Sequence, residues 1–370
     1  MPPYRPDCRH FEGDRPCRFR RPCEGCPHFA PLGLRVLIVK LAARGDVLRT
    51  TPLLPALKQA HPGSHVTWVT RPESIEMLAG LEEIDRLLPL DVDALARLGA
   101  ERFDEVWCLD KEPAATGLAT RVAADVKRGF LLGPHGNLVP ANDDADYAFR
   151  LGIDDALKFR GNRRSHQEIL FETVGLPWRR QPYRLEVPTA SARRARERWA
   201  DGGLAPGERV VGFNVGAGEG FAHKDWRVEG FAELADRVRS ELGLRVALLG
   251  GPDDRPRVDA VAKRVPDALD PGAAPSILEF AALVEGCAAV VSGDTLAMHL
   301  ALARGVPVVA IFGSTCPQEI ELYGRGERVV PAIACHPCYR RRCDLDPSCA
   351  DAVSAEQVFS ALLRVLEATA

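Results

Sequence analysis

The chain has 370 residues, 46% of them hydrophobic, and a net charge of −3, which is the composition of a globular protein with room for two domains. The nearly balanced charge argues against a broad nucleic-acid-binding surface. Because the apolar runs are too short to cross a bilayer and residues 1–30 lack the apolar core of a signal peptide, we expect a soluble, cytoplasmic enzyme.

Cysteines gather near both ends of the chain. In a reducing compartment, such clustering favours bound metal over disulfides. The first cluster lies in residues 1–32, where Pro and Arg are frequent and neither a helical nor a strand period is present. A tetrahedral zinc ion would supply the folding energy that this segment lacks, with an iron–sulfur cluster, disulfides or unpaired thiols as alternatives. The cluster consists of Cys8, Cys17, Cys23 and Cys26.

The next segment predicts a βαβ unit. A strand of the buried type over 36–41 is followed by a helix over about 47–60 and by a second strand over 66–70. Asp46 follows Gly45 at the mouth of the first strand, where open α/β sheets place their chemistry. The plainer interpretation of an Asp at this position is a helix N-cap.

The first domain continues with further strands and helices. Apolar patterns predict a strand at 106–109, a helix at 114–124 and a strand at 128–131. Residues 142–174 look helical and rich in charge, which indicates either a solvated helical hairpin or an excursion that faces an acceptor molecule.

The Pro-rich stretch over 176–209 predicts the junction between two domains. It holds a short basic helix, whose arginines we expect to form a solvated face. Contact between this face and an anionic membrane surface is the alternative. The arginines are Arg193, Arg194, Arg196 and Arg198.

The second domain opens with a strand over 210–214 and a glycine-rich loop over 215–220. This loop matches neither the dinucleotide fingerprint nor the P-loop, because Asp225 follows Lys224 where a P-loop has Ser or Thr. A lysine after such a loop is still well placed to meet a diphosphate. Three helices are predicted at 228–242, 255–264 and 277–285, and a strand at 245–249.

The strand at 245–249 ends in an acidic pair that includes Asp254. An acid at the end of such a strand accepts hydrogen bonds from ribose hydroxyls, or else caps a turn.

Residues 288–315 predict strand, tight turn, helix and strand in close succession. Thr295 lies at the N-cap of the helix, and His299 lies in its first turns. Backbone N–H groups and the positive end of the helix dipole therefore point out of the carboxyl edge of the sheet, which suits a phosphate. A purely structural βαβ unit explains the apolar residues equally well, but it does not need Asp294, Thr295 and His299 at the end of the strand.

The second cysteine cluster lies near the C-terminus and has closer, knuckle-like spacing than the first. We expect it to hold zinc or iron in a structural role. An amphipathic helix over 355–366 closes the chain. The cluster consists of Cys335, Cys338, Cys343 and Cys349.

Four segments, in their order and spacing, resemble glycosyltransferase family 9, the ADP-heptose:lipopolysaccharide heptosyltransferases and their relatives. The similarity spans roughly residues 33–350. Its most specific elements are Gly45-Asp46 and the run from Gly293 to His299. The four segments are VLIVKLAARGDVLRTTPLLPALK, NVGAGEGFAHKDW, LLGGPDD and VVSGDTLAMHLALARGVPVVAIFGST.

The resemblance implies an α/β fold of the GT-B type, in which two Rossmann-like domains face each other across a cleft. In this chain, small cysteine-rich segments are added at both ends. We expect a cysteine-rich segment at 1–32, an acceptor domain at 33–185, a nucleotide-sugar domain at 186–330 and a knuckle with a closing helix at 331–370.

The resemblance also implies inverting transfer of a sugar, most simply heptose from ADP-heptose, to a hydroxyl of a lipopolysaccharide or surface-polysaccharide acceptor. The partners it implies are a nucleotide-sugar donor and a glycolipid or polysaccharide acceptor, with room for peripheral contact at the inner face of the membrane. No obligatory catalytic metal and no nucleic acid is implied.

By position, each motif residue takes on a family role. Asp46 matches the general base, and Lys224 matches the lysine that meets the donor phosphates. Asp254 matches the acid that binds the ribose. The remaining contacts to the donor sugar and diphosphate match Asp294, Thr295, Met298 and His299.

Two residues depart from the family pattern. Leu296 stands where the family usually has Gly, and Arg44 stands where an apolar residue is commoner. The alternatives are therefore an enzyme with another nucleotide-sugar donor, an enzyme with a protein or natural-product acceptor, and a non-catalytic nucleotide-binding module that uses its cysteine knuckles for docking. Because a binding module has no use for a base, Asp46 and Lys224 together favour an enzyme.

Overall fold

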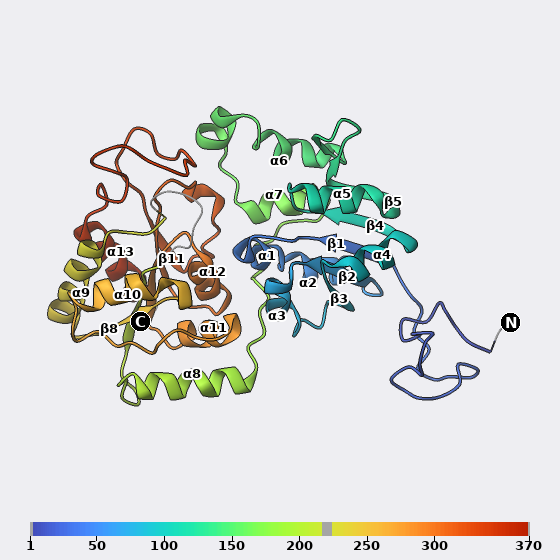
Figure 1. The fold of residues 1–370 in the computed structure, drawn as a ribbon, viewed down its shortest axis with the longest axis horizontal. Coiled ribbons are helices and arrows are strands. Elements are labelled where there is room, and N and C mark those ends of the chain that lie inside the picture. Colours follow the sequence, from blue (N-terminus) through green and yellow to red (C-terminus); the bar gives the residue numbers. More distant parts are fainter. Residues whose placement is uncertain (1–2, 217–223, 369–370) are drawn as a thin grey trace. The chain divides into compact units, whose positions relative to one another are not determined.

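The computed structural model describes residues 3–216 and 224–368, and its contacts divide the chain into two compact α/β units (Figure 1). Each unit has its own sheet with helices around it, so the predicted α/β fold with two Rossmann-like domains is confirmed. The first unit comprises Met1–Ala43, Thr50–Arg150 and Ile169–Gln181, and the second comprises Arg44–Arg49, Leu151–Glu168 and Pro182–Ala370. The cysteine-rich ends thus belong to one unit each, and two short stretches before residue 182 group with the second unit.

The sheet of the first unit has the strand order β3-β2-β1-β4-β5-β6. Its first five strands in this order are parallel, and the short edge strand β6 pairs antiparallel to β5. The chain reverses direction across the sheet beside β1, as in dinucleotide-binding folds. The strands are β1 (Arg35–Val39), β2 (His65–Thr70), β3 (Arg86–Pro89), β4 (Arg102–Cys108), β5 (Ala123–Leu132) and β6 (Leu138–Pro140).

The helix predicted over 47–60 is two helices, α1 (Arg44–Thr50) and α2 (Leu53–Ala60). Pro52 separates them, because a proline inside a helix removes a backbone donor and clashes with the preceding turn. The region predicted helical over 142–174 is likewise broken into short pieces. Its helices are α6 (Asp146–Arg150), a π-helical turn (Leu157–Gly161) and α7 (His166–Thr173).

Helices cover both faces of the first sheet. Leu37 and Val39 of β1 pack in one cluster with α4 and α5, while Val36 and Ile38, which alternate with them, are equally buried. Helix α3, between β2 and β3, and helix α4, after β3, were not predicted from the sequence. The remaining helices are α3 (Ile75–Leu78), α4 (Val92–Ala100) and α5 (Pro113–Arg121).

The sheet of the second unit is parallel and has the order β11-β10-β9-β7-β8. Its chain direction reverses between β7 and β9, and in open α/β sheets the ligand-binding crevice forms at such a reversal, at the carboxyl ends of the strands. The strands are β7 (Val210–Asn214), β8 (Arg245–Leu249), β9 (Ala289–Gly293), β10 (Val308–Ile311) and β11 (Gly326–Val329).

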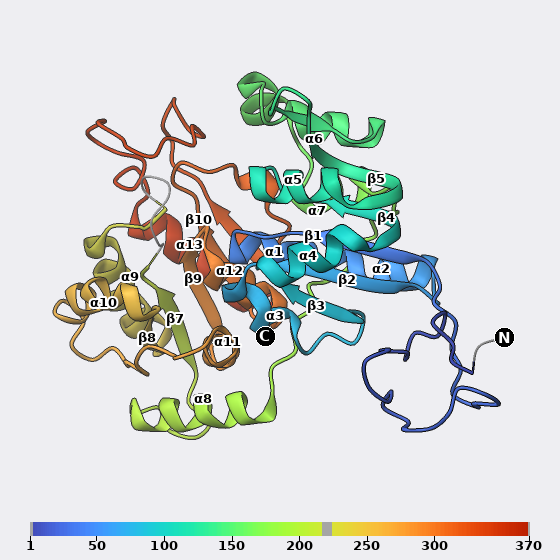
Figure 2. The ribbon, with the colours of Figure 1, turned by 45° about the vertical axis from the view of Figure 1, so that its right-hand side comes forward.

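Helices lie on both faces of the second sheet (Figure 2). The side chains of its strands alternate strictly between two hydrophobic clusters, one under each helix layer. In β7, for example, Val211 and Phe213 join the cluster around α9, α10 and α13, whereas Val210 joins the cluster around α8, α11 and α12. The helices are α8 (Thr189–Asp201), α9 (Val228–Leu242), α10 (Arg255–Ala262), α11 (Ile277–Glu285), α12 (Leu296–Ala303) and α13 (Ala355–Glu367).

The arginines of α8 do not form the purely solvated face that the sequence predicts. Arg194 and Arg198 both form ion pairs with Glu279 of α11, whose side chain is fully buried. A buried carboxylate is costly unless it is paired, so the two guanidinium groups fasten α8 onto α11. Arg193 and Arg196 remain exposed.

In the parts of the chain that the structure describes, no helix is both long and apolar enough to span a membrane.

Candidate functional site

Polar side chains meet at the carboxyl ends of β7 and β9, where the second sheet reverses its chain direction. Asn214 ends β7 and lies in register with Ser292 of β9. The amide nitrogen of Asn214 donates to Ser292 Oγ at 3.2 Å, to Thr295 Oγ1 at 3.2 Å and to the Gly216 carbonyl at 2.8 Å. This network fixes the two loops that form the floor of the crevice.

Thr295 is the N-cap residue of α12, as predicted, and its backbone is extended. Its hydroxyl lies 3.1 Å from Ser292 Oγ, and within the described residues its side chain makes no capping bond to the helix. The first backbone N–H groups of α12 are therefore not occupied by the Thr295 side chain and can donate to a ligand. Such a helix N-terminus favours an anion such as a phosphate.

Asp294 joins two of the predicted site residues. Lys224 Nζ lies 3.5 Å from one carboxylate oxygen, and His299 Nε2 lies 3.9 Å from the other. Burial opposes ionisation of Asp294, but Lys224 and the neighbouring His299 and Arg49 outweigh this effect and hold its pKa below the usual value. Gly293 is required here, since a Cβ atom at that position would stand 1.9 Å from the Lys224 carbonyl oxygen.

His299 is buried and held by a hydrogen-bonded chain. Gln167 Nε2 donates to Tyr183 Oη at 2.8 Å, and Tyr183 Oη lies 3.2 Å from His299 Nδ1. Burial, and then the charge of Arg49, lower the pKa of His299 to about 3, so the ring is neutral at pH 7. The Asp294 carboxylate, which faces Nε2, favours the tautomer with the proton on that nitrogen, and in this tautomer Nδ1 accepts the hydrogen bond from Tyr183 Oη.

Asp46 lies beside this group, because the preceding residue, Gly45, packs directly against the His299 ring. Arg49 Nη1 is 3.1 Å from Asp46 Oδ1, and Arg49 Nη2 donates to the Glu319 carbonyl at 3.2 Å. The Arg49 side chain is only 9% exposed, whereas that of Asp46 is 38% exposed. A buried cation thus orients a carboxylate that solvent and ligands can reach.

The loop that leads into α1 is fixed from the first unit. Asp110 follows β4, and its Oδ2 accepts hydrogen bonds from the backbone N–H groups of Leu41 at 3.0 Å and Ala42 at 3.1 Å. Lys40 Nζ lies 3.3 Å from the same oxygen. These contacts hold the turn directly before Asp46.

The structure brings most of the predicted site residues together. The group that consists of Asp46, Lys224, Asp294, Thr295 and His299 is called the cradle below. The glycine-rich stretch from 217 to 223 lies outside the described residues.

For the two other predicted donor-binding residues, the structure shows contacts with the surrounding protein. Asp254 accepts a 2.8 Å hydrogen bond from the Gly251 N–H, and it lies against the backbone of Gly216, where a Cβ atom would be 2.0 Å from its carboxylate. Met298 is fully buried in the core between α12 and the sheet. Its place on the inner face of α12 makes it a core residue that supports His299, which is the next residue.

Sequence reasoning missed several side chains that build the cradle. Arg49 stands three residues after Asp46 on a helix, a spacing that places the two on one face and could have signalled the pair. Asn214 and Ser292 are polar residues at the ends of apolar strands, which is a weaker signal. Tyr183 and Gln167 carry no local signal, because each is recruited from a loop or helix far away in the chain.

The chemistry open to the cradle follows from its charges. A half-exposed carboxylate can take a proton from a hydroxyl group, and Lys224 with the amides of α12 can stabilise a departing anion. Neutral His299 adds an N–H donor on Nε2. The combination suits transfer of a group away from a phosphate-type leaving group.

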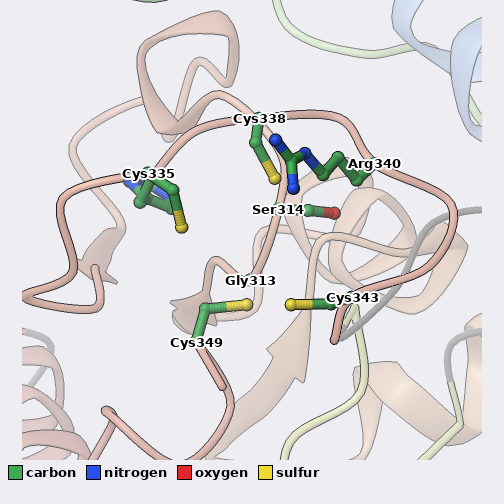
Figure 3. A pocket seen from close by; sticks show the side chains of 8 residues that line it. Gly313, Ser314, Cys335, Cys338, Arg340, Cys343 and Cys349 are labelled. Atoms are coloured by element: carbon green, nitrogen blue, oxygen red, sulfur yellow. The ribbon is translucent and has the colours of Figure 1, made fainter. Parts of the chain in front are cut away.

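Both cysteine clusters consist of thiols without disulfide bonds. In the N-terminal cluster, Cys8, Cys17 and Cys23 each begin a tight turn, with backbone bonds such as Arg20 N to Cys17 O at 2.8 Å. In the C-terminal cluster all four cysteines line one small pocket (Figure 3). Burial, and then the three other thiols, raise the pKa of Cys349 to about 11. Among the described residues, no three His, Cys, Asp or Glu side chains already form a metal site.

Comparison with known proteins places the chain among transferases. The model of glycosyltransferase family 9 (heptosyltransferase) matches residues 162–348, half of the chain. Lipopolysaccharide heptosyltransferase 1 of Pseudomonas aeruginosa is 28% identical over 328 residues, which are 85% of this chain and 89% of that protein. The Escherichia coli K12 protein of the same name is 24% identical over 81% of this chain and 94% of its own length.

Solved structures agree in fold. A family 9 glycosyltransferase from Veillonella parvula superposes with a TM-score of 0.73 at 22% identity, over 90% of this chain and 98% of that chain. The E. coli ADP-heptose lipopolysaccharide heptosyltransferase II superposes with a TM-score of 0.65 at 17% identity, over 91% and 99% of the two chains.

Proposed function

Since this chain belongs to glycosyltransferase family 9, we propose that it transfers heptose, with inversion, from ADP-heptose to a hydroxyl of a lipopolysaccharide-type acceptor. The relatives named above are lipopolysaccharide heptosyltransferases, and they match this chain over most of their length. The observation that carries the proposal is the position of Asp46, which lies with Arg49 in the same unit as the Asp294–Lys224 pair.

On the acceptor side, Asp46 is the general base. Its carboxylate takes the proton of the acceptor hydroxyl as the oxygen attacks the anomeric carbon of the sugar. Arg49 keeps this carboxylate oriented, and its own carbonyl partner at Glu319 prevents it from swinging away. Inverting transfer needs one such base and no second catalytic acid, because a diphosphate is a good leaving group.

On the donor side, fixed positive groups receive the charge of the departing diphosphate. Lys224 Nζ and the amides at the start of α12 point toward the crevice at the ends of β7 and β9. Asp294, with its pKa held low, anchors Lys224 and accepts hydrogen bonds from sugar hydroxyls. Asp254, at the end of β8, takes the ribose. We therefore propose direct transfer without an obligatory catalytic metal.

The test is a transfer assay with a panel of ADP-, UDP- and GDP-sugars on the full-length protein. We expect turnover with ADP-heptose, and loss of about 100-fold to 10,000-fold in the Asp46→Asn variant with nearly unchanged ADP affinity. Asp93→Asn, in an exposed acid of α4, is the matched control and should keep full activity.

Other results of the panel decide between the alternatives. Turnover with another nucleotide sugar would keep the mechanism and change the donor, and half-buried Leu296 at the start of α12 is the residue to examine first. Binding of ADP without any turnover would contradict the enzyme and favour a nucleotide-binding module. Full activity of Asp46→Asn would remove Asp46 as the base.

We also propose that the protein works at the cytoplasmic face of the membrane through peripheral contact, because a lipopolysaccharide-type acceptor is anchored in lipid. Exposed Arg193 and Arg196 on α8 give this contact a cationic element. Co-sedimentation with vesicles that contain anionic lipid should fall in an Arg193→Ala/Arg196→Ala variant. Equal sedimentation of both proteins would contradict a role of α8.

A further inference from the structure

The C-terminal loop between β11 and α13 places four thiols around one small space. Cys335, Cys338, Cys343 and Cys349 line a pocket with a volume of about 10 Å³, about the space of one water-sized occupant. Figure 3 shows the four sulfur atoms turned toward the space between them. Spacings of two, four and five residues between successive cysteines bring ligands from one loop together, as in structural metal knuckles.

The loop has no regular secondary structure to hold it together. Between Val329 and Ala355 the described structure contains neither helix nor strand. Isolated contacts anchor it instead: the Ser314 carbonyl accepts hydrogen bonds from Cys338 N at 3.0 Å and Tyr339 N at 2.9 Å, and Arg160 donates to the carbonyl of His336 at 3.0 Å. A bound ion that joins four points of such a loop would supply folding energy that backbone pairing does not.

Two further side chains of the pocket fit a metal–thiolate centre. A divalent ion together with four thiolates carries a net charge of about −2, and the cationic Arg340 also lines the pocket. His336 also lines the pocket, and its buried Nε2 has no hydrogen-bond partner among the described residues. A metal-bound sulfur would give this nitrogen an acceptor.

We propose that Cys335, Cys338, Cys343 and Cys349 bind one tetrahedral divalent metal ion, zinc or iron(II), in a structural site. Each thiol loses its proton on binding, and no electron is transferred. The sulfur atoms do not yet surround a common point in metal-binding geometry, so the ion draws the loop closed around itself. Thiolate ligands favour zinc and iron over harder cations.

The site is connected to the cradle by contacts of Tyr339, the residue after Cys338. Tyr339 Oη donates to Glu319 Oε2 at 2.8 Å, and the Glu319 carbonyl accepts the hydrogen bond from Arg49. Arg49 in turn orients Asp46. We therefore expect the metal to stabilise the position of the proposed base, a consequence that rests on the proposed function, whereas metal binding itself does not.

The first measurement is metal content per chain, by mass spectrometry of full-length protein purified with zinc or iron(II) and without oxygen. To separate the two clusters, the background is a variant with Ser at positions 8, 17, 23 and 26. We expect one equivalent of metal there, and almost none after Cys343→Ser is added. Cys287→Ser, which removes a buried thiol of the core, should leave the metal in place.

The second measurement needs no change at the pocket. In the same background, a thiol reagent should count four additional reactive cysteines after a chelator removes the metal. Cobalt(II) in place of the native ion should produce the strong visible bands of a tetrahedral thiolate site, and the native spectrum tells iron from zinc. Absence of metal after reconstitution, metal content unaffected by Cys343→Ser, or a pair of disulfides in the freshly prepared protein would each overturn the proposal.

The link to the cradle is tested separately. Metal removal should lower kcat about tenfold or more while ADP affinity changes little, since the base is displaced and the donor side is not. An unchanged kcat would contradict the proposed effect of the metal on Asp46 through Tyr339, but it would not contradict the metal site itself. A protein that binds metal and transfers no sugar would contradict the proposed function alone.

Discussion

Gly45 lies directly against the ring of His299, since a Cβ atom at position 45 would stand 2.9 Å from His299 Cδ2. This approach brings the start of α1 onto α12, and it places Asp46 beside the Asp294–Lys224 pair. A side chain at position 45 would have to displace either the ring or the helix that carries Asp46.

Gly45→Ala should therefore lower kcat by about tenfold to 100-fold, because small displacements of a catalytic group are costly. Circular dichroism and the unfolding midpoint should show a folded protein. Gly99→Ala in α4 is the control, since a Cβ atom there meets nothing within 4 Å. If the two alanine variants have equal kcat, the close packing of Gly45 on His299 has no catalytic consequence.

Tyr183→Phe removes the hydroxyl that holds His299 Nδ1 and keeps the ring. We expect the imidazole to lose its single tautomer, which nitrogen chemical shifts of His299 would report, and kcat to fall about tenfold. Donor KM should change little. Tyr4→Phe, in an exposed tyrosine of the N-terminal segment, should alter neither quantity. An unchanged tautomer in Tyr183→Phe would mean that another group orients the ring.

Lys224→Met should raise the donor KM and lower kcat together, because the lysine meets the diphosphate in both the ground state and the transition state. Loss of the charge also leaves Asp294 without the partner 3.5 Å away. A combined loss in kcat/KM of about 100-fold to 1,000-fold is expected from removal of one such donor. Lys263→Met, at the exposed end of α10, is the control. Equal kinetics of the two variants would exclude Lys224 from the donor site.

We expect the free energy of unfolding to depend on pH through His299. Its pKa falls from 6.5 in the unfolded chain to about 3 in the folded protein, so between these values only the unfolded chain binds the proton. The free energy of unfolding should thus fall as pH drops below 6.5, by up to about 1.4 kcal/mol per pH unit from this group. The lowered pKa of Asp294 acts in the same direction at lower pH.

Urea unfolding between pH 7 and pH 5 measures this slope. His299→Gln should show a smaller slope than the unmodified protein, whereas His135→Gln, in an exposed histidine, should not. A wild-type stability that stays constant over this range would contradict a lowered pKa of His299 in the folded protein.

Several elements of the second unit could be predicted from the sequence residue by residue, although strand β11 was not predicted. Strands at 210–214 and 245–249 and helices at 228–242 and 277–285 coincide with β7, β8, α9 and α11. The reason is local, because short β-branched runs bounded by glycine, serine or aspartate specify a buried strand without reference to distant residues. The same reasoning located Thr295 at the N-cap of α12.

Local patterns are less informative where an element depends on its neighbours. Proline divided the helix predicted over 47–60, and two arginines of α8 turned from solvent to buried Glu279. Met298 belongs to a motif shared with the family, yet its side chain is part of the core. Pro52 is a local signal inside the predicted helix, whereas the partners of the arginines and of Met298 lie elsewhere in the chain, and neighbouring residues do not identify them.

The sequence by itself determined the fold class, the polar ends of the strands and the identity of the residues suited to phosphate and proton chemistry. Only the tertiary structure decided which of them meet. Arg49 reaches the Glu319 carbonyl across 270 residues, and Tyr183 reaches His299 across 116. Such pairs follow from the strand order and the close packing of α1 on α12, which are properties of the assembled sheet and not of any short segment.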